Sequence, residues 1–546
     1  MKMKKIDKYI LPICYTIVFI IVIMMFNALE FNSNATYIGF NVLTNSDSCL
    51  LVQISKDILS DPKAIFDWHY GTCFYFFPNL LIVLLLTTFL STPSIIIFVN
   101  SLLIFFITLF LLNYLFLRIL HISKICVAIA NLSLTLFLAF TADSSDFCFL
   151  TPHLFMPLHS GALINALGSL ILCFMYLNNN NKTSLVFLII LSIVAMFSDF
   201  IFLIYFSIPL VLTLLTLYFF GKKQINRKKY ITVVLLLVFS YIFTFILHKI
   251  SINSGIFMLE AFKNLFYNIK DSFILMFNSI FEVFTKNYIS IIIFFLSSFS
   301  LVLSFFHALK YLFFNKNKKN IISENSLLYS IFTCYFLVLI FAATIINGSF
   351  QGIDCIRYII PPFYIGIFNI GLYIHLYAHK RNKVGLTRII ALSFISVYTF
   401  FIILNYSLIN PSSLYLKVKN YYPPMIKAAD NMSLKYKVKN GIGNYWDARF
   451  ITIFSKQGIT VDLVSPEYTP MKFANNPRKY YTNYNNDSVY YNFIVNYSNE
   501  DTAKLYQVFN KKNITKDTIE GNIFYLLPSF YLENDFRTFR IKEINN

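Results

Sequence analysis

The sequence predicts an all-α polytopic transmembrane domain followed by a small α/β domain. Hydrophobic residues make up 57% of the 546 residues and charged residues only 13%, against about 25% charged residues in an ordinary soluble domain. Apolar runs fill residues 1–408, whereas the chain becomes rich in Asn, Lys, Tyr and Asp from about Asn410. We therefore divide it into a transmembrane domain (1–408) and a C-terminal domain (409–546).

Eleven segments of the first domain are candidates for membrane-spanning helices. Most approach the roughly 20 apolar residues that are needed to cross a hydrocarbon core, and 185–198 is the shortest of them. The candidates are 9–29, 95–117, 125–141, 158–177, 185–198, 200–220, 231–248, 289–309, 327–346, 362–379 and 389–408.

A further apolar run, 79–90, is too short to cross the membrane. As a helix it reaches only ~18 Å, against a hydrocarbon core of ~30 Å. Pro78 precedes the run and Pro93 follows it, as expected for a short helix between two helix-breaking residues. We expect this helix to lie along the outer interface, which leaves residues 30–78 as one large first outer loop.

The basic residues indicate the orientation of the chain. The net charge is +19, and the Lys and Arg residues are concentrated in short clusters between apolar runs, such as 222–229 and 316–319. Clusters placed in this way face the cytoplasm, and they argue against nucleic-acid binding. We expect a cytoplasmic N-terminus kept as an uncleaved signal anchor, an extracytoplasmic C-terminus, and, from the Asn, Lys, Ile and Phe content, a bacterial inner (plasma) membrane.

The C-terminal domain shows alternating strand patterns. Residues 461–464, 491–495 and 524–527 are short runs of β-branched and aromatic residues, typical of strands. Residues 501–510 have the composition of a helix. The tail is therefore predicted to be a small α/β domain, and it contains no recognisable catalytic motif.

Asp47 is the sharpest candidate for a catalytic residue. It lies in the first outer loop, in the segment 45–48 (Asn-Ser-Asp-Ser), ahead of Trp68 and His69. A carboxylate close to the outer membrane surface can act as a general base toward an acceptor hydroxyl. The alternative is that Asp47 caps a helix that begins near Cys49, because Asp and Ser are preferred at that position.

A second polar group follows the third predicted span. Asp143, Asp146, His153 and His159 lie close together in the sequence at the outer membrane face. Two carboxylates and two imidazoles can bind a divalent metal ion or transfer protons. The alternative is a solvated loop, since the tight spacing of a His-x-x-x-His metal motif is absent.

Two further polar positions lie at the edge of apolar segments. Asp199 interrupts an apolar stretch, where a carboxylate is costly unless it faces water, pairs with a cation or caps a helix. Arg357, next to Tyr358, is the only Arg or Lys in the outer loop 347–361. Its guanidinium suits a lipid phosphate, and the alternatives are a salt bridge to Asp354 or contact with head groups.

Four of the eight cysteines fall in predicted outer loops. They are Cys49, Cys73, Cys148 and Cys355. In an oxidising space they can form two disulfides in three possible pairings; Cys49 with Cys73 would close the first loop.

The pattern of residues 249–288, the remaining outer segment, predicts one or two amphipathic helices. They would form either a lid over a lipid substrate or a connector.

This arrangement resembles the GT-C superfamily of membrane glycosyltransferases. Those enzymes have many transmembrane helices, a first outer loop with a catalytic Asp or Glu, and a short interfacial helix opened by a proline motif. Here Asp47 matches the carboxylate and residues 76–79 (Phe-Phe-Pro-Asn) match the motif. Residues 443–449 (Gly-Asn-Tyr-Trp-Asp-Ala-Arg) are similar to a segment of bacterial members. The second acidic residue often found in the first loop is absent, because Ser48 follows Asp47.

The resemblance implies a glycosyltransferase that uses a polyprenyl-phosphate-linked sugar donor at the extracytoplasmic membrane face. Asp47 would deprotonate a hydroxyl of a saccharide or lipid acceptor. We expect the other site residues to be Arg357, Tyr358, Trp68, His69 and Asp199 for substrate binding, and Asp143, Asp146 and His153 for a possible divalent metal.

Two other functions are compatible with the sequence. A transporter or flippase for a lipid-linked saccharide predicts polar residues at mid-membrane depth and broken helices near the midplane. A non-catalytic membrane scaffold, which would bind a partner through its tail domain, predicts that Asp47 and Arg357 are dispensable.

Overall fold

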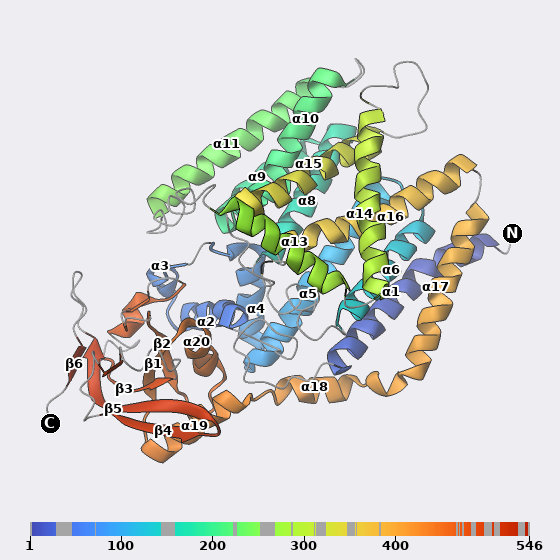
Figure 1. The fold of residues 1–546 in the computed structure, drawn as a ribbon. Coiled ribbons are helices and arrows are strands. Elements are labelled where there is room, and N and C mark those ends of the chain that lie inside the picture. Colours follow the sequence, from blue (N-terminus) through green and yellow to red (C-terminus); the bar gives the residue numbers. More distant parts are fainter. Residues whose placement is uncertain are drawn as a thin grey trace.

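The computed structural model describes most of the chain. The described residues are 3–28, 46–70, 73–142, 159–221, 227–251, 268–285, 288–310, 312, 324–346, 355, 358–381, 384–465, 468, 470–471, 474–481, 488–495, 505–506, 514–532 and 541–543. Within them the structure confirms the predicted fold class: a bundle of long apolar helices carries a small domain with one β-sheet at its C-terminal end (Figure 1).

Each of the eleven predicted spans is a helix. Eight helical segments among the described residues are long and apolar enough to cross a membrane, which makes the chain a multi-pass membrane protein, whereas α6, α9 and α16 do not meet that criterion. The total of eleven crossings stays a prediction. The helices are α1 (Met3–Ala28), α5 (Pro93–Tyr114), α6 (Lys124–Ala142), α8 (Ser160–Asn179), α9 (Lys182–Ser198), α10 (Ile208–Phe220), α11 (Arg227–Ser251), α14 (Tyr288–Leu309), α15 (Glu324–Ile346), α16 (Ile360–Arg381) and α17 (Val384–Leu404).

Uncharged polar side chains inside the bundle bond to one another across helices. Asn113 and Asn131 exchange two hydrogen bonds, of 3.2 and 2.8 Å, between α5 and α6. Tyr329 of α15 donates to Asn369 of α16 at 2.8 Å. Such pairs hold transmembrane helices together, because lipid offers a polar group no other partner.

Helices α8 and α9 form a hairpin that brings two candidate site residues, His159 and Asp199, to the same end of the bundle. Asn180 ends α8 in the left-handed conformation, with φ 54°. Asn181 then caps α9 by accepting hydrogen bonds from the backbone N–H groups of Thr183 and Ser184. Because the turn is this tight, the start of α8 and the end of α9 lie side by side.

The predicted short helix after Pro78 is α4 (Leu81–Phe89), of only 9 residues. It packs against α2 (Ser46–Ser60), the helix of the first loop that begins just before Asp47, and against α5. The segment 249–288 contains α13 (Ile269–Thr285), which exposes Phe273, Phe277 and Phe281. This helix was predicted; its role as lid or connector stays open.

The C-terminal domain contains a mixed six-stranded sheet. The strands run in the order β2 (Thr460–Leu463), β1 (Asn440–Gly443), β3 (Tyr491–Val495), β5 (Asn522–Leu532), β4 (Thr515–Ile519), and β6 (Ile541–Glu543) pairs with β5. β1 is parallel to both of its neighbours, and the other pairs are antiparallel. The helices of this domain are α18 (Pro411–Lys419), α19 (Pro424–Tyr436) and α20 (Tyr445–Phe454).

The three predicted strands of the tail are confirmed as β2, β3 and part of β5. Strand β1 was missed because its sequence, Asn-Gly-Ile-Gly, lacks a strand pattern. Gly441 is required there by close packing, since a Cβ atom would lie 2.3 Å from the ring of Phe493. The predicted helix 501–510 lies mostly outside the described residues. Only Leu505 and Tyr506 of this segment are described, and both are helical.

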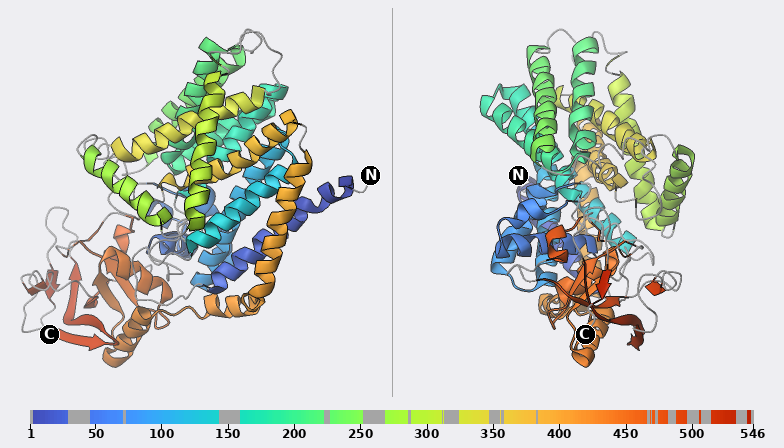
Figure 2. Two further views of the ribbon diagram at one scale, coloured as in Figure 1. Left: turned by 45° about the vertical axis from the view of Figure 1, so that its right-hand side comes forward. Right: turned by 90° about the vertical axis from the view of Figure 1, so that its left-hand side faces the viewer.

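The C-terminal domain docks on α2 and α3 (Ala64–Asp67) of the first loop, at one end of the helix bundle (Figures 1 and 2). Arg449 of α20 is fully buried at this contact. Its Nε donates to the Gln53 side chain of α2 at 2.9 Å, and its Nη2 donates to the Ala474 carbonyl at 2.5 Å. A charge removed from water in this way must keep its partners, so the two domains are fixed to each other.

A second set of contacts extends the same junction. The Asp57 carboxylate of α2 accepts hydrogen bonds from the indole of Trp68 at 3.0 Å and from Lys479 at 2.5 Å. The main chains of His69 and Asn475 pair through two hydrogen bonds of 2.8 and 3.0 Å. Trp68 is only 1% exposed, so this part of the first loop forms one packed unit with the tail.

Asp462 in β2 should make the stability of this unit depend on pH. Burial raises the pKa of its carboxyl to about 6, although Tyr491 donates a hydrogen bond to it at 2.7 Å. The folded state therefore holds this proton more tightly than the unfolded state does, and stability falls as pH rises from about 4 to about 6.

The variant Asp462→Asn keeps an oxygen acceptor for Tyr491 but has no carboxyl to ionise. We expect its melting temperature to rise relative to the wild type as the pH increases from about 4 to 7. Trp68 and Trp446 are the only tryptophans of the chain, so their fluorescence reports melting of this region. In the control variant Asp517→Asn no such rise should appear, because hydrogen bonds from Lys435 and Tyr436 lower the pKa of Asp517, and this carboxyl is therefore ionised in both states above about pH 4. Parallel pH profiles of wild type and Asp462→Asn would contradict the prediction.

Candidate active site at the ends of the membrane helices

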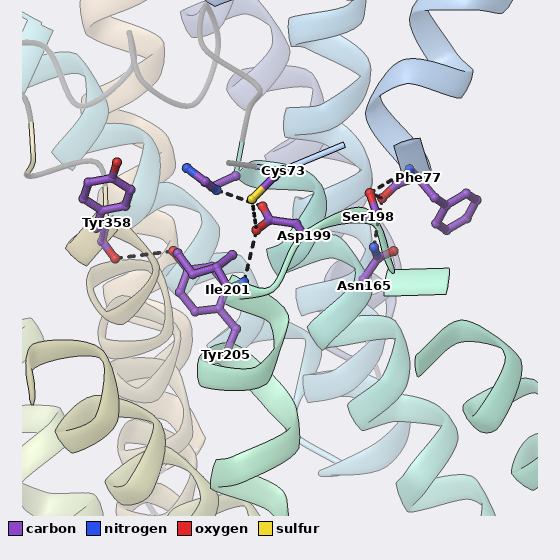
Figure 3. A network of polar contacts seen from close by, with 9 residues as sticks. Cys73, Phe77, Asn165, Ser198, Asp199, Ile201, Tyr205 and Tyr358 are labelled. Atoms are coloured by element: carbon purple, nitrogen blue, oxygen red, sulfur yellow. Dashed lines mark hydrogen bonds and ion pairs between the residues drawn. The ribbon is translucent and has the colours of Figure 1, made fainter. Parts of the chain in front are cut away.

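A buried polar cluster forms where α8 begins and α9 ends (Figure 3). Asp199 follows the last residue of α9 and is 3% exposed. One of its oxygens, Oδ2, lies 2.8 Å from Nδ1 of His159. The other, Oδ1, accepts hydrogen bonds from the Cys73 thiol at 3.1 Å and from the Ile201 N–H at 3.0 Å.

The chain segment that carries Cys73 is fastened to the end of α9. The Tyr75 N–H donates to the Ser198 carbonyl at 3.0 Å, and the Phe77 N–H donates to the Ser198 hydroxyl at 2.9 Å. That hydroxyl and the Asn165 amide both donate to the Phe77 carbonyl at 3.0 Å. Figure 3 shows these contacts from Asn165, Ser198 and Phe77. The position of Cys73 therefore depends on backbone bonds next to Asp199.

Tyrosine rings enclose the imidazole of His159. The ring centroid of Tyr75 lies 5.6 Å away and that of Tyr358 lies 5.4 Å away. Tyr205, which is fully buried, donates to the Tyr358 carbonyl at 3.4 Å (Figure 3). Tyr358 was predicted to bind substrate, and the structure places its ring beside the Asp199–His159 pair.

Asp47 lies at a different point, on the contact between α2 and the C-terminal domain. It is 7% exposed and belongs to the first turn of α2, where a negative charge is favourable. Its Oδ1 accepts a hydrogen bond of 2.6 Å from Tyr445 of α20. Burial raises the pKa of Tyr445, which keeps the phenol protonated, and the guanidinium carbon of Arg449 lies 4.9 Å from its ring centroid.

The predicted substrate-binding residues Trp68 and His69 belong to the same junction. The Trp68 side chain is buried and donates to Asp57, and the main chain of His69 pairs with Asn475. In this arrangement both residues serve the contact between the domains. Their role in substrate binding stays a prediction.

Several other candidates lie outside the described residues: Asp143, Asp146, His153, Cys148 and Arg357. The possible disulfide between Cys49 and Cys73 is absent from the structure. Cys49 is buried within α2, whereas the thiol of Cys73 bonds to Asp199. Cys355 is also a thiol.

The arrangement offers two kinds of chemistry at one end of the membrane domain. Asp47 is a carboxylate whose orientation is set by a proton donor from the soluble domain. The Asp199 cluster combines a carboxylate, an imidazole and a thiol, and one ligand atom from each lies within 4.8 Å of the other two. Among the described residues this is the group with the composition of a metal site.

Comparisons with known proteins leave the family open. No family model matches the chain, and no curated protein is similar to it. Solved structures similar to the chain include an Archaeoglobus fulgidus oligosaccharyltransferase tethered to an acceptor peptide, with 13% identity and a TM-score of 0.47, covering 99% of this chain and 74% of that one. The A. fulgidus oligosaccharyltransferase AglB, with an inhibitory peptide and a dolichol-phosphate, gives 11% identity and a TM-score of 0.44, covering 99% and 75%. Likeness at this level does not establish an activity.

Gly161 should be essential for the packing of this region. A Cβ atom at this position, in the first turn of α8, would lie 2.7 Å from Oδ1 of Asn79 and 2.9 Å from Cδ of Pro78. We expect Gly161→Ala to lower stability by about 1–3 kcal/mol, as overpacking does in a filled interior. Thermal melting of the purified protein in detergent measures this. The matched control is Gly385→Ala, because nothing lies within 4 Å of its added Cβ; equal melting of the two variants would contradict the prediction.

Proposed function

We propose that the chain is a membrane glycosyltransferase. It transfers a sugar from a polyprenyl-phosphate-linked donor to a hydroxyl of a saccharide or lipid acceptor at the extracytoplasmic face. The observation that carries the proposal is the position of Asp47: a nearly buried carboxylate, next to the membrane helices, with one oxygen bonded to Tyr445 of the soluble domain. The similar oligosaccharyltransferase structures agree with this class but, at their TM-scores, add no independent support.

Asp47 acts as the general base in this proposal. Its carboxylate takes the proton of the acceptor hydroxyl while the hydroxyl oxygen attacks the anomeric carbon of the donor sugar. The bond between that carbon and the phosphate oxygen breaks, and its electron pair leaves with the polyprenyl phosphate. Tyr445 bonds to Oδ1, which fixes the plane of the carboxylate for this step.

The remaining site residues are assigned to the donor. Arg357 would balance the phosphate charge of the leaving group, and Tyr358 would contact the sugar or phosphate beside it. Trp68, His69 and Asp199 complete the proposed substrate-binding set, and a metal ion at Asp143, Asp146 and His153 would add further charge stabilisation. Of these, Tyr358 and Asp199 are the described residues that belong to one cluster, through His159.

An enzyme is favoured over a transporter by the distribution of acidic residues. Within the eight described membrane spans, the only Asp or Glu is Glu324, at the first residue of α15. A carrier of a charged lipid-linked saccharide would need ionisable groups near the midplane. Here the carboxylates Asp47 and Asp199 lie instead at helix ends.

Replacing Asp47 by Asn should abolish most sugar transfer. The amide keeps the shape of the side chain but cannot accept a proton, so the rate should fall by ~10²–10⁴-fold. The assay supplies radiolabelled polyprenyl-phosphate sugars and a crude membrane acceptor fraction to proteins of matched expression and melting temperature. The control is Asp61→Asn, a partly exposed carboxylate beyond the end of α2 whose ion pair with Arg478 spans 3.6 Å. Equal rates of sugar transfer by Asp47→Asn and the wild type would show that Asp47 is not the general base.

Removing only the Tyr445 hydroxyl tests how Asp47 is positioned. The variant Tyr445→Phe keeps the ring beside Arg449 and loses the hydrogen bond to Asp47. Because that bond fixes the plane of the carboxylate, the rate of sugar transfer should fall, with a smaller loss than in Asp47→Asn. A rate equal to that of the wild type would assign Tyr445 to packing alone.

A further inference from the structure

We propose that Cys73, His159 and Asp199 bind a transition-metal ion of the zinc type. The three residues come from separate parts of the chain: the end of the first loop, the residue before α8 and the residue after α9. This site differs from the metal site predicted at Asp143, Asp146 and His153, and it does not depend on the proposed glycosyl transfer.

The distances between the ligand atoms are close to those of a filled site. The Cys73 sulfur lies 3.1 Å from Oδ1 of Asp199, and Nδ1 of His159 lies 2.8 Å from Oδ2. In a tetrahedral zinc site, bonds of about 2.0–2.3 Å put neighbouring ligand atoms about 3.3–3.6 Å apart. The ligand atoms of all three residues lie within 4.8 Å of one another, so side-chain movements of up to roughly 1 Å would admit the ion.

The ion would take the place of protons. The thiol of Cys73 donates to Asp199, and the imidazole of His159 shares a hydrogen between Nδ1 and the same carboxylate. Metal binding releases the thiol proton to solvent and leaves the imidazole neutral, with its hydrogen on Nε2. Two hydrogen bonds are thereby exchanged for bonds to one cation.

The three ligands are held in place before any ion arrives. Asp199 is fixed by its N–H bond to the Ala195 carbonyl at 2.8 Å and by the Ile201 N–H on Oδ1. The Cys73 segment is fixed by Tyr75, whose N–H bonds to Ser198. The His159 ring lies between Tyr75 and Tyr358. Supporting contacts of this kind orient ligands and raise metal affinity.

The ligand set selects the class of metal. A thiolate with an imidazole and a carboxylate favours zinc or cobalt, whereas magnesium, calcium and manganese prefer oxygen ligands. The side chains of His159 and Asp199 are 18% and 4% exposed, so the site is shielded from bulk water but still reachable at the imidazole. Three protein ligands leave a fourth position open, as in catalytic zinc sites.

Metal content and cobalt absorption test this proposal directly. The full chain is purified in detergent without a metal-binding tag, stripped with a chelator, and then given Zn²⁺ or Co²⁺. We expect one ion per chain by elemental analysis, and a near-ultraviolet thiolate-to-cobalt absorption band that added Mg²⁺ does not displace. Zn²⁺ should also raise the melting temperature, because it binds the folded state.

Two cysteine variants separate this site from other thiols. The band should disappear in Cys73→Ser and persist in the control Cys334→Ser, whose half-buried thiol lies in α15. Asp199→Asn should weaken zinc binding while retaining the band at saturating Co²⁺. Absence of bound ion and of the band in the folded wild type, or a band that survives in Cys73→Ser, would overturn the proposal and leave a hydrogen-bonded triad. Neither result depends on sugar transfer, so failure here leaves the proposed function standing.

Discussion

The buried guanidinium of Arg449 sets the relation between the two domains. From α20 it reaches across to Gln53 of α2, and within its own domain it bonds to the Ala474 carbonyl; loss of these partners would leave a charge buried away from water. Tyr445, one turn earlier on the same helix, consequently reaches the Asp47 carboxylate. The soluble domain is thus part of the candidate site, since one of its side chains fixes the orientation of the proposed base.

The bilayer imposes the second constraint: the membrane-spanning segments are apolar, and charged groups lie at the helix ends. Inside the bundle, uncharged pairs such as Asn113 with Asn131 hold neighbouring helices together. Asp199 and His159 lie at helix ends because the α8–α9 hairpin returns the chain to the face from which it entered. The same geometry brings Cys73 to them from the first loop, and it supports both a lipid-substrate enzyme and a metal site there.

Sequence patterns predicted the helices of the membrane domain well because the length needed to span a bilayer is nearly fixed, whereas α18, α19 and α20 of the C-terminal domain were not predicted. Strands β1 and β4 escaped prediction, since β1 is half glycine and β4 is a polar strand with exposed residues. Asp47 and Asp199 were found one by one, as carboxylates at a membrane edge. Their partners were not found: Cys73 is 126 residues from Asp199 and Tyr445 is 398 residues from Asp47, separations at which a single sequence carries no local signal.

We infer that this chain moves a sugar from a lipid-linked donor at the face that carries the C-terminal domain. The most direct test reconstitutes the wild type in proteoliposomes with a radiolabelled polyprenyl-phosphate sugar and follows the label. We expect the label to leave the donor lipid for an acceptor supplied on the side of the C-terminal domain, with release of polyprenyl phosphate. Label that remains entirely on the donor, whichever sugar and acceptor are supplied, would exclude this activity.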